Sequence, residues 1–275
     1  MMQHRKLFYV ALLTFLLCSD SVTAQRSPCA STIPYGNNAA AGRYATVNGI
    51  KLYYEIYGQG PALLLLHGND GSLVSMACQI AAFAANHKVI AVDGRGRGKS
   101  DDGKDRFTFE LQADDFAALL AHESVTRADV IGHSDGGITA LVMGLRHPTQ
   151  VNRIVAVSPN LRPEALVDDL LIDMKQGLEY INERIAANDK SENWSRYKRQ
   201  VEQDLYEPHI AAEQLKKIAA PVLLVRAAED VIRHEHFDEM RANLLQGELL
   251  ILPGTIHQDT LINARFNQEV ARFLK

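Results

Sequence analysis

One stretch, residues 128–140, constrains the fold of this chain more than any other. An apolar run ends in the pattern Gly-x-Ser-x-Gly, formed by Gly132, Ser134 and Gly136, and an apolar helical pattern follows at once. This order indicates a strand, a sharp turn and a helix, with a serine exposed at the apex. The flanking glycines let strand and helix pass closely. The alternative is a glycine-rich turn in which the serine only caps the helix.

Strand and helix patterns alternate along most of the chain. Two alternating runs flank Asn48-Gly49 and predict a hairpin over residues 44–57. Short strands are predicted at 62–66, 88–92, 128–131, 151–157, 221–225 and 248–252, and helices at 73–85, 109–120, 135–145, 237–245 and 261–274. Strands that alternate with helices indicate an α/β fold with a doubly wound, mostly parallel sheet.

Residues 161–212 interrupt this alternation. They have a helical pattern, many acidic residues and the only tryptophan of the chain, Trp194. Ligands bind at the carboxyl ends of the strands in such sheets, so we expect a small helical cap there and take Trp194 as a candidate substrate contact. The expected division is a leader (1–24), a tail (25–42), a core in two parts (43–160 and 213–275) and the cap (161–212) between them.

The N-terminus has the pattern of a secretory signal. Basic residues precede an apolar run over residues 7–18, and small side chains stand at Val22 and Ala24. We expect cleavage after Ala24, a secreted or periplasmic protein, and no stable membrane span after cleavage. The alternatives are an uncleaved anchor and a lipidated Cys18, which the bulky Leu17 disfavours.

Two cysteines remain once the leader is removed. Cys29 and Cys78 form an even pair, as expected of a protein in an oxidising compartment. A disulfide that ties the tail to the core and a pair of unpaired thiols both remain open at this point.

Composition and motif spacing exclude several classes of partner. The net charge of −4 over 275 residues gives no signal for nucleic acid. A Gly-Lys-Ser sequence at 98–100 resembles a phosphate loop, but Asp93 occupies the position of the required glycine and no helix pattern follows. His234 and His236 lack the further ligands that a metal site needs. No cofactor and no metal are predicted.

A serine hydroxyl needs a base in contact with it and a carboxylate to orient that base. His257 and Asp230 each follow a late predicted strand, so both belong at the same edge of the sheet as Ser134. The chain order Ser134, Asp230, His257 is the order expected for a serine at such an elbow.

Several motifs in one order resemble those of the α/β-hydrolases, a large family of esterases, lactonases and carbon–carbon bond hydrolases. The resemblance covers residues 43–275 and rests on His67-Gly68, Asp93-x-Arg95-Gly96-x-Gly98-x-Ser100, the elbow, Asp230 and Pro253-Gly254-x-x-His257. Ala227 stands where the family usually has a glycine before the acid. Together with the adjacent Glu229, it leaves the identity of the acid in question.

The resemblance implies a mechanism. Ser134 would attack an acyl carbon, His257 would carry the proton, Asp230 would orient His257, and the N–H groups of Asn69 and Asp135 would form the oxyanion hole. His67 is expected to order its loop, and His133 is expected to pack beside the nucleophile.

Asp135 bears on the substrate. Residues 132–141 resemble the elbow of biphenyl-hydrolase-like enzymes, which place an aspartate against the ammonium group of amino-acid esters. The alternative role of Asp135 is to favour the start of the following helix. We therefore expect a serine hydrolase for a small-molecule carboxylic ester, with an aminoacyl ester as a refinement. A lactonase or carbon–carbon bond hydrolase, or a low-turnover ligand-binding relative, remains open.

Overall fold

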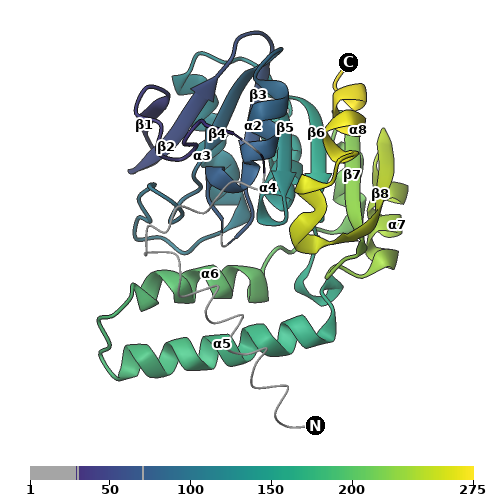
Figure 1. The fold of residues 1–275 in the computed structure, drawn as a ribbon. Coiled ribbons are helices and arrows are strands. Elements are labelled where there is room, and N and C mark those ends of the chain that lie inside the picture. Colours follow the sequence, from purple (N-terminus) through teal and green to yellow (C-terminus); the bar gives the residue numbers. More distant parts are fainter. Residues whose placement is uncertain (1–28, 30, 70) are drawn as a thin grey trace.

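The computed structural model describes residue 29, residues 31–69 and residues 71–275 of the chain. Its centre is an eight-stranded sheet with the order β1-β2-β4-β3-β5-β6-β7-β8. β2 pairs antiparallel with both β1 and β4, and all other neighbours are parallel. The predicted doubly wound, mostly parallel α/β sheet is confirmed (Figure 1).

The antiparallel edge of the sheet is the predicted hairpin. β1 (Gly42–Val47) and β2 (Ile50–Tyr57) flank Asn48 and Gly49, which have φ angles of 43° and 78°. A two-residue turn with both φ values positive matches the right-handed twist of the strands, and Asn-Gly is the pair that adopts it most readily.

The central strands are short and apolar. They are β3 (Ala62–Leu66), β4 (Lys88–Val92), β5 (Ala128–His133) and β6 (Val151–Val157). Residues of β3 that face opposite sides, such as Leu64 and Leu65, are both fully buried. Helices therefore cover both faces of the sheet, as a parallel sheet requires.

The last two strands extend beyond the predicted ends. β7 spans Val222–Glu229 and β8 spans Gly247–Ile256. Polar residues and a proline interrupt their apolar patterns, but the two strands stay paired as far as Glu229 and Ile256. Their true ends therefore place Asp230 and His257 directly at the carboxyl edge.

Two groups of helices sandwich the sheet (Figure 1). α3 (Phe109–His122), α4 (Asp135–Arg146) and α7 (His234–Asn243) pack on one face, together with the 3₁₀ helix η3 (Ala212–Lys217). The 3₁₀ helix η1 (Leu73–Met76), α2 (Ala77–Phe83) and α8 (Phe266–Phe273) pack on the other.

The helix predicted over 261–274 is wrong in one respect. The chain forms a 3₁₀ helix, η4 (His257–Ile262), and then α8 as a separate element. Asn263 has extended backbone angles, and its side-chain oxygen accepts a hydrogen bond of 2.9 Å from the Arg265 N–H. Such a local side-chain bond competes with helix continuation.

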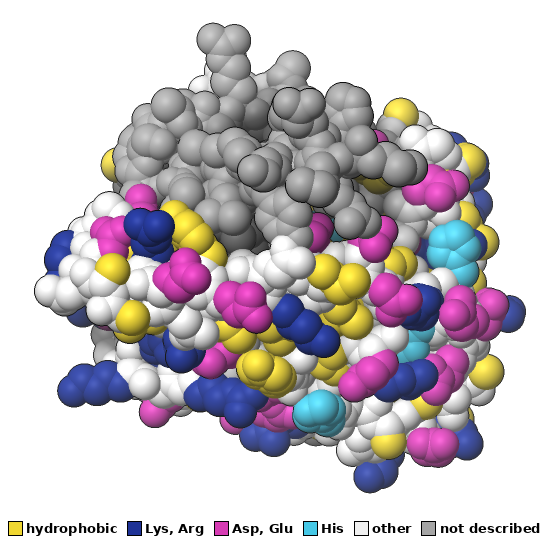
Figure 2. Space-filling model, turned by 90° about the horizontal axis from the view of Figure 1, so that it is seen from below, with side chains coloured by type: hydrophobic (Ala, Val, Ile, Leu, Met, Phe, Trp, Pro, Cys, Tyr) yellow, Lys and Arg dark blue, Asp and Glu magenta, His cyan; other side chains and the backbone are white. Residues whose placement is uncertain are grey.

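The cap lies between β6 and β7 in the chain. After a short 3₁₀ turn, η2 (Pro163–Ala165), it consists of α5 (Asp168–Ala186) and α6 (Trp194–Tyr206), which lie side by side below the sheet in Figure 1. Seen from the cap side, Figure 2 shows acidic and basic side chains interspersed with apolar ones on the described surface. Within the described ranges, no helix combines the length and apolarity needed to cross a bilayer.

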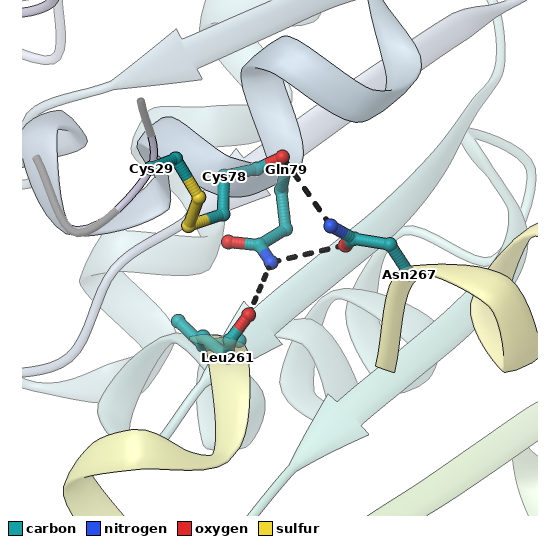
Figure 3. Close-up of a disulfide and its surroundings, with 5 residues drawn as sticks. All are labelled: Cys29, Cys78, Gln79, Leu261 and Asn267. Carbon is teal, nitrogen blue, oxygen red and sulfur yellow. Dashed lines mark hydrogen bonds between the residues drawn. A yellow bond between two sulfur atoms is a disulfide. The ribbon is translucent and has the colours of Figure 1, made fainter. Parts of the chain in front are cut away.

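The tail is held to the core by a disulfide. Cys29 is bonded to Cys78 on α2, with their Cα atoms 5.3 Å apart (Figure 3). The structure thus decides between the two alternatives that the sequence left open. The neighbouring Gln79 donates hydrogen bonds to the Leu261 carbonyl and to Asn267, so α2 also contacts η4 and α8. The expected leader lies outside the described residues.

Candidate active site

The elbow at Ser134 has the geometry that its glycines allow. Ser134 has φ 54° and ψ −118°, a region that non-glycine residues seldom adopt, and its N–H donates to the Val157 carbonyl at 2.8 Å. A Cβ on Gly132 would lie 2.0 Å from the Gly136 carbonyl oxygen, and a Cβ on Gly136 would lie 2.3 Å from the Leu66 oxygen. The tight packing of β5, α4 and β3 therefore excludes any side chain at either position.

Three residues from distant parts of the chain meet in one hydrogen-bonded line. The His257 Nε2 lies 3.2 Å from the Ser134 Oγ, and its Nδ1 lies 2.8 Å from Oδ1 of Asp230. Because a carboxylate only accepts, the Nδ1 atom carries a proton, and Nε2 can then accept the hydrogen bond that the serine hydroxyl donates. The structure brings together the three residues that the sequence selected.

Asp230 is held in the ionised form. Burial alone would raise its pKa, but the hydrogen bond and charge of His257, followed by hydrogen bonds from Ser158 and Ala227, lower the pKa below its usual value. The Ser158 hydroxyl donates to Oδ2 at 2.6 Å, and the Ala227 N–H donates to the same oxygen at 3.0 Å. Sequence reasoning missed Ser158, because no motif marks a serine at the end of β6.

The structure also answers the question about the acid. Glu229 is exposed and is the last residue of β7, whereas Asp230 carries the bond to His257. Ala227, which replaces the usual glycine, is fully buried, and its N–H supports Asp230. The departure from the family pattern therefore leaves this site intact.

Comparison with known proteins agrees with the fold. A family model described as "alpha/beta hydrolase fold" matches residues 61–197. The enol-lactonase of Burkholderia xenovorans, 22% identical, has a TM-score of 0.70 to this structure over 84% of this chain and 99% of that chain. The chain belongs to the α/β-hydrolase fold family.

Curated relatives match parts of this α/β-hydrolase. Rat bifunctional epoxide hydrolase 2 is 32% identical over 149 residues, which are 52% of this chain and 27% of the relative. The putative carbamate hydrolase RutD of Caulobacter sp. is 34% identical over 125 residues, 43% of this chain and 46% of the relative. The matches thus span less than half the length of these relatives.

Two further histidines of the α/β-hydrolase site have structural contacts. His67 accepts a hydrogen bond of 3.0 Å from the Gly94 N–H at Nε2 and donates through Nδ1 to the Gly68 carbonyl at 2.6 Å. His133 donates through Nε2 to the His257 carbonyl at 3.0 Å. Burial lowers the pKa of His67 to about 4 and that of His133 to about 3, so both rings are neutral. His67 thus orders its loop and His133 packs against His257 beside the nucleophile, as the sequence predicted.

The loop after β3 lies against the nucleophile. A Cβ on Gly68 would stand 3.3 Å from the Ser134 Cβ, so the loop approaches the nucleophile closely at this point. Asn69 is the next residue of the loop. The Arg97 guanidinium donates to both the carbonyl and the side-chain oxygen of Asn69. Its Nη2 also lies 4.0 Å from Oδ2 of Asp135. Arg97, which the sequence did not mark, therefore links the two residues predicted for the oxyanion hole.

The structure does not bring Trp194 to the triad. Its side chain is 5% exposed and packs edge-on against Tyr180 and Tyr197, inside the apolar cluster between α5 and α6. An aromatic residue at the start of an amphipathic helix can serve either a substrate or a core, and its spacing alone does not tell which. The described contacts of Trp194 belong to the core of the cap.

His236 also has structural partners in place of a metal. Its Nε2 accepts a hydrogen bond from the Leu161 N–H at 2.9 Å, and its Nδ1 lies 2.9 Å from a Glu239 oxygen. Over the part of the chain that the structure describes, no group of three metal-ligating side chains is found.

Proposed function

We propose that this α/β-hydrolase is a serine hydrolase that cleaves a small-molecule carboxylic ester through an acyl-enzyme on Ser134. The observation that carries the proposal is the hydrogen-bonded line from Ser134 through His257 to Asp230. A buried carboxylate at one end and a hydroxyl at the other make the imidazole a base for that hydroxyl.

The reaction proceeds in two steps. The Ser134 Oγ bonds to the acyl carbon while Nε2 of His257 takes the hydroxyl proton, and the carbon–oxygen bond to the alcohol breaks as Nε2 returns that proton to the alcohol. A water then gives its proton to Nε2 and its oxygen to the acyl carbon. The bond to Oγ breaks, Oγ regains the proton, and the acid leaves.

Two backbone N–H groups are suited to the oxyanion. Asp135 is the first residue of α4, so its N–H has no intrahelical acceptor and points out of the helix N-terminus. Asn69 follows Gly68 in the loop that packs against Ser134, which supports its N–H as the second donor. One such donor contributes about 3 kcal/mol to transition-state stabilisation.

The aminoacyl-ester refinement depends on Asp135. The side chain is 9% exposed, and the Arg97 guanidinium nearby opposes the binding of a second cation. Asp135→Asn tests the refinement through the ratio of kcat/KM for an aminoacyl ester to that for an uncharged acyl ester. An unchanged ratio rejects amine recognition, and a fall of about tenfold or more supports it.

A panel of chromogenic esters that vary in acyl length and charge tests the proposal. We expect turnover by the wild-type protein, none by Ser134→Ala, and rapid fluorophosphonate labelling of the wild type alone. Lactones and vinylogous diketones added to the panel test the lactonase and carbon–carbon hydrolase alternatives. Slow labelling with no turnover would favour the ligand-binding alternative.

We also propose that the leader is removed and that the protein is secreted or periplasmic. The Cys29–Cys78 disulfide supports this location, because such bonds persist in oxidising compartments. Mass spectrometry of protein from fractionated cells tests it. A mature chain that starts at Gln25 in the periplasm or medium is expected, and an intact, reduced chain in the cytoplasm would reject it.

A further inference from the structure

α6 presents a polar face to the core. Arg199, Gln200, Gln203 and Asp204 have the spacing of one helix face, while the buried apolar residues of the same helix pack toward α5. Gln200 donates to the Gly96 carbonyl at 3.0 Å, and Gln203 accepts from Gln112 at 3.1 Å. Arg199 bonds to the carbonyls of residues 103 and 105 at 3.1 Å and to the Asp102 side chain. The cap is therefore seated on the core by hydrogen bonds.

Asp204 is the member of this face that touches the proposed oxyanion hole. Its Oδ2 accepts a hydrogen bond from the side-chain amide of Asn69. Arg97 holds the same residue from the other side, through the Asn69 side-chain oxygen and carbonyl. The position of Asn69, and hence the direction of its N–H, thus depends on Arg97 of the core and on two residues of the cap: Asp204, and Gln200, whose carbonyl accepts from the Asn69 side-chain amide at 3.5 Å.

Asp204 also reaches the second oxyanion residue. Its carboxyl lies within hydrogen-bonding reach of Asp135, and burial together with the Asp135 charge raises the pKa of Asp204 well above its usual value. A protonated Asp204 can accept from Asn69 through one oxygen and donate to Asp135 through the other. The carboxyl pair then carries a single negative charge beside Arg97.

We propose that Asp204 is a positioning residue of the cap that holds the two residues of the oxyanion hole in place. It contacts the two residues that supply the N–H donors, and it acts through them without touching the substrate. The inference rests on the proposed function. Its physical basis is that such donors act only when they are held in place before charge develops in the transition state.

Three variants of the full chain test this role through kcat, KM and thermal unfolding. Asp204→Ala should lower kcat by about tenfold or more, with KM changed less than about twofold, because the lost contact serves the transition state. Asp204→Asn should keep kcat within about threefold of wild type, since its amide can accept from Asn69 and donate to Asp135. Arg199→Met, the matched control, removes other cap–core bonds and should keep kcat within about threefold.

The pH dependence gives a readout that a merely structural contact would not move. The charged and titratable groups around Asp204 are Asp135 on α4 and Arg97 after β4. These two residues line a small pocket together with His67. Loss of the Asp204 proton places a second negative charge beside Asp135, so kcat of the wild type should fall as the pH rises through the raised pKa of Asp204. Asp204→Asn has no proton to lose there and should lack this fall.

The inference is overturned if Asp204→Ala keeps the kcat of the wild type, or if Arg199→Met loses as much of kcat as Asp204→Ala does. If Asp204→Ala does not fold, the pH profile of Asp204→Asn decides, and a fall identical to that of wild type overturns it. If the wild type hydrolyses no ester, the proposed function fails separately. The rate of fluorophosphonate labelling of Ser134 then replaces kcat, because the phosphonyl oxygen needs the same N–H donors.

Discussion

The Ser158 hydroxyl donates a hydrogen bond of 2.6 Å to Oδ2 of Asp230, while Oδ1 of the same carboxylate faces His257. The acid of the triad is thus fixed from both sides. Ser158 follows β6 directly and has a φ of 50°, so the backbone turns there to aim the hydroxyl at the acid. The line from Ser134 consequently extends one residue further, to Ser158.

Ser158→Ala should lower kcat by about three- to tenfold and leave KM nearly unchanged, because one neutral-to-charged hydrogen bond of about 1.5 kcal/mol is lost. In the wild type this bond lowers the pKa of Asp230, so its removal should raise that pKa and shift the acid limb of the kcat/KM profile to higher pH. Ser124→Ala is the matched control, since Ser124 also has a positive φ, of 55°, but is exposed and remote. Identical profiles for the two variants would contradict the role of Ser158.

Gly132→Ala should prevent correct folding of the elbow, because the new Cβ would lie 2.0 Å from a backbone oxygen. We expect loss of activity and a fall in stability of more than about 3 kcal/mol, measured by chemical denaturation. Gly177→Ala in α5 is the control, since a Cβ there meets nothing within 4 Å. That variant should gain up to about 1 kcal/mol from helix propensity. A native-like Gly132→Ala enzyme would disprove the close packing of β5 against α4.

The protein should lose stability in mild acid. His67 and His133 have pKa values lowered to about 4 and about 3, so the unfolded chain binds more protons than the folded one below about pH 6.5. Each histidine therefore removes up to about 1.4 kcal/mol per pH unit as the pH falls. Asp93 acts in the opposite sense, because burial raises its pKa to about 6 and the folded state gains a proton.

Denaturant titrations between pH 7.5 and 5 measure this slope. His133→Asn should make the slope shallower by up to about 1.4 kcal/mol per pH unit, whatever its effect at pH 7.5. The control is His122→Asn, because His122 is exposed; this variant should have the same slope as the wild type. A slope that is the same in all three proteins would show that His133 is not buried in the neutral form.

Reduction of the Cys29–Cys78 disulfide should destabilise the protein while the triad keeps its hydrogen bonds. The bond closes a loop with a sequence separation of 49, for which chain entropy gives an upper estimate of about 4 kcal/mol. The melting temperature should fall when reductant is added to the wild type. Cys29→Ser/Cys78→Ser should melt at the lower temperature with or without reductant. A wild-type melting temperature that ignores reductant would indicate that the bond does not form.

Local patterns in the sequence determined the alternating elements, the Asn-Gly hairpin, the serine elbow and the three residues of the triad. They did so because burial periodicity, turn chemistry and close backbone packing leave their marks within a few residues of chain. The sequence also showed that Ala227 replaces the usual glycine of the family, although only the structure showed that the Ala227 N–H supports Asp230.

The tertiary structure alone decided the rest. It paired Cys29 with Cys78, placed Trp194 inside the cap, extended β7 and β8 as far as Glu229 and Ile256, and brought Ser158, Arg97 and Asp204 to the site. Each of these depends on contacts between segments far apart in the chain. The identity of a residue and its neighbours in sequence do not specify which distant group it will meet, because packing of the whole core and cap determines that choice.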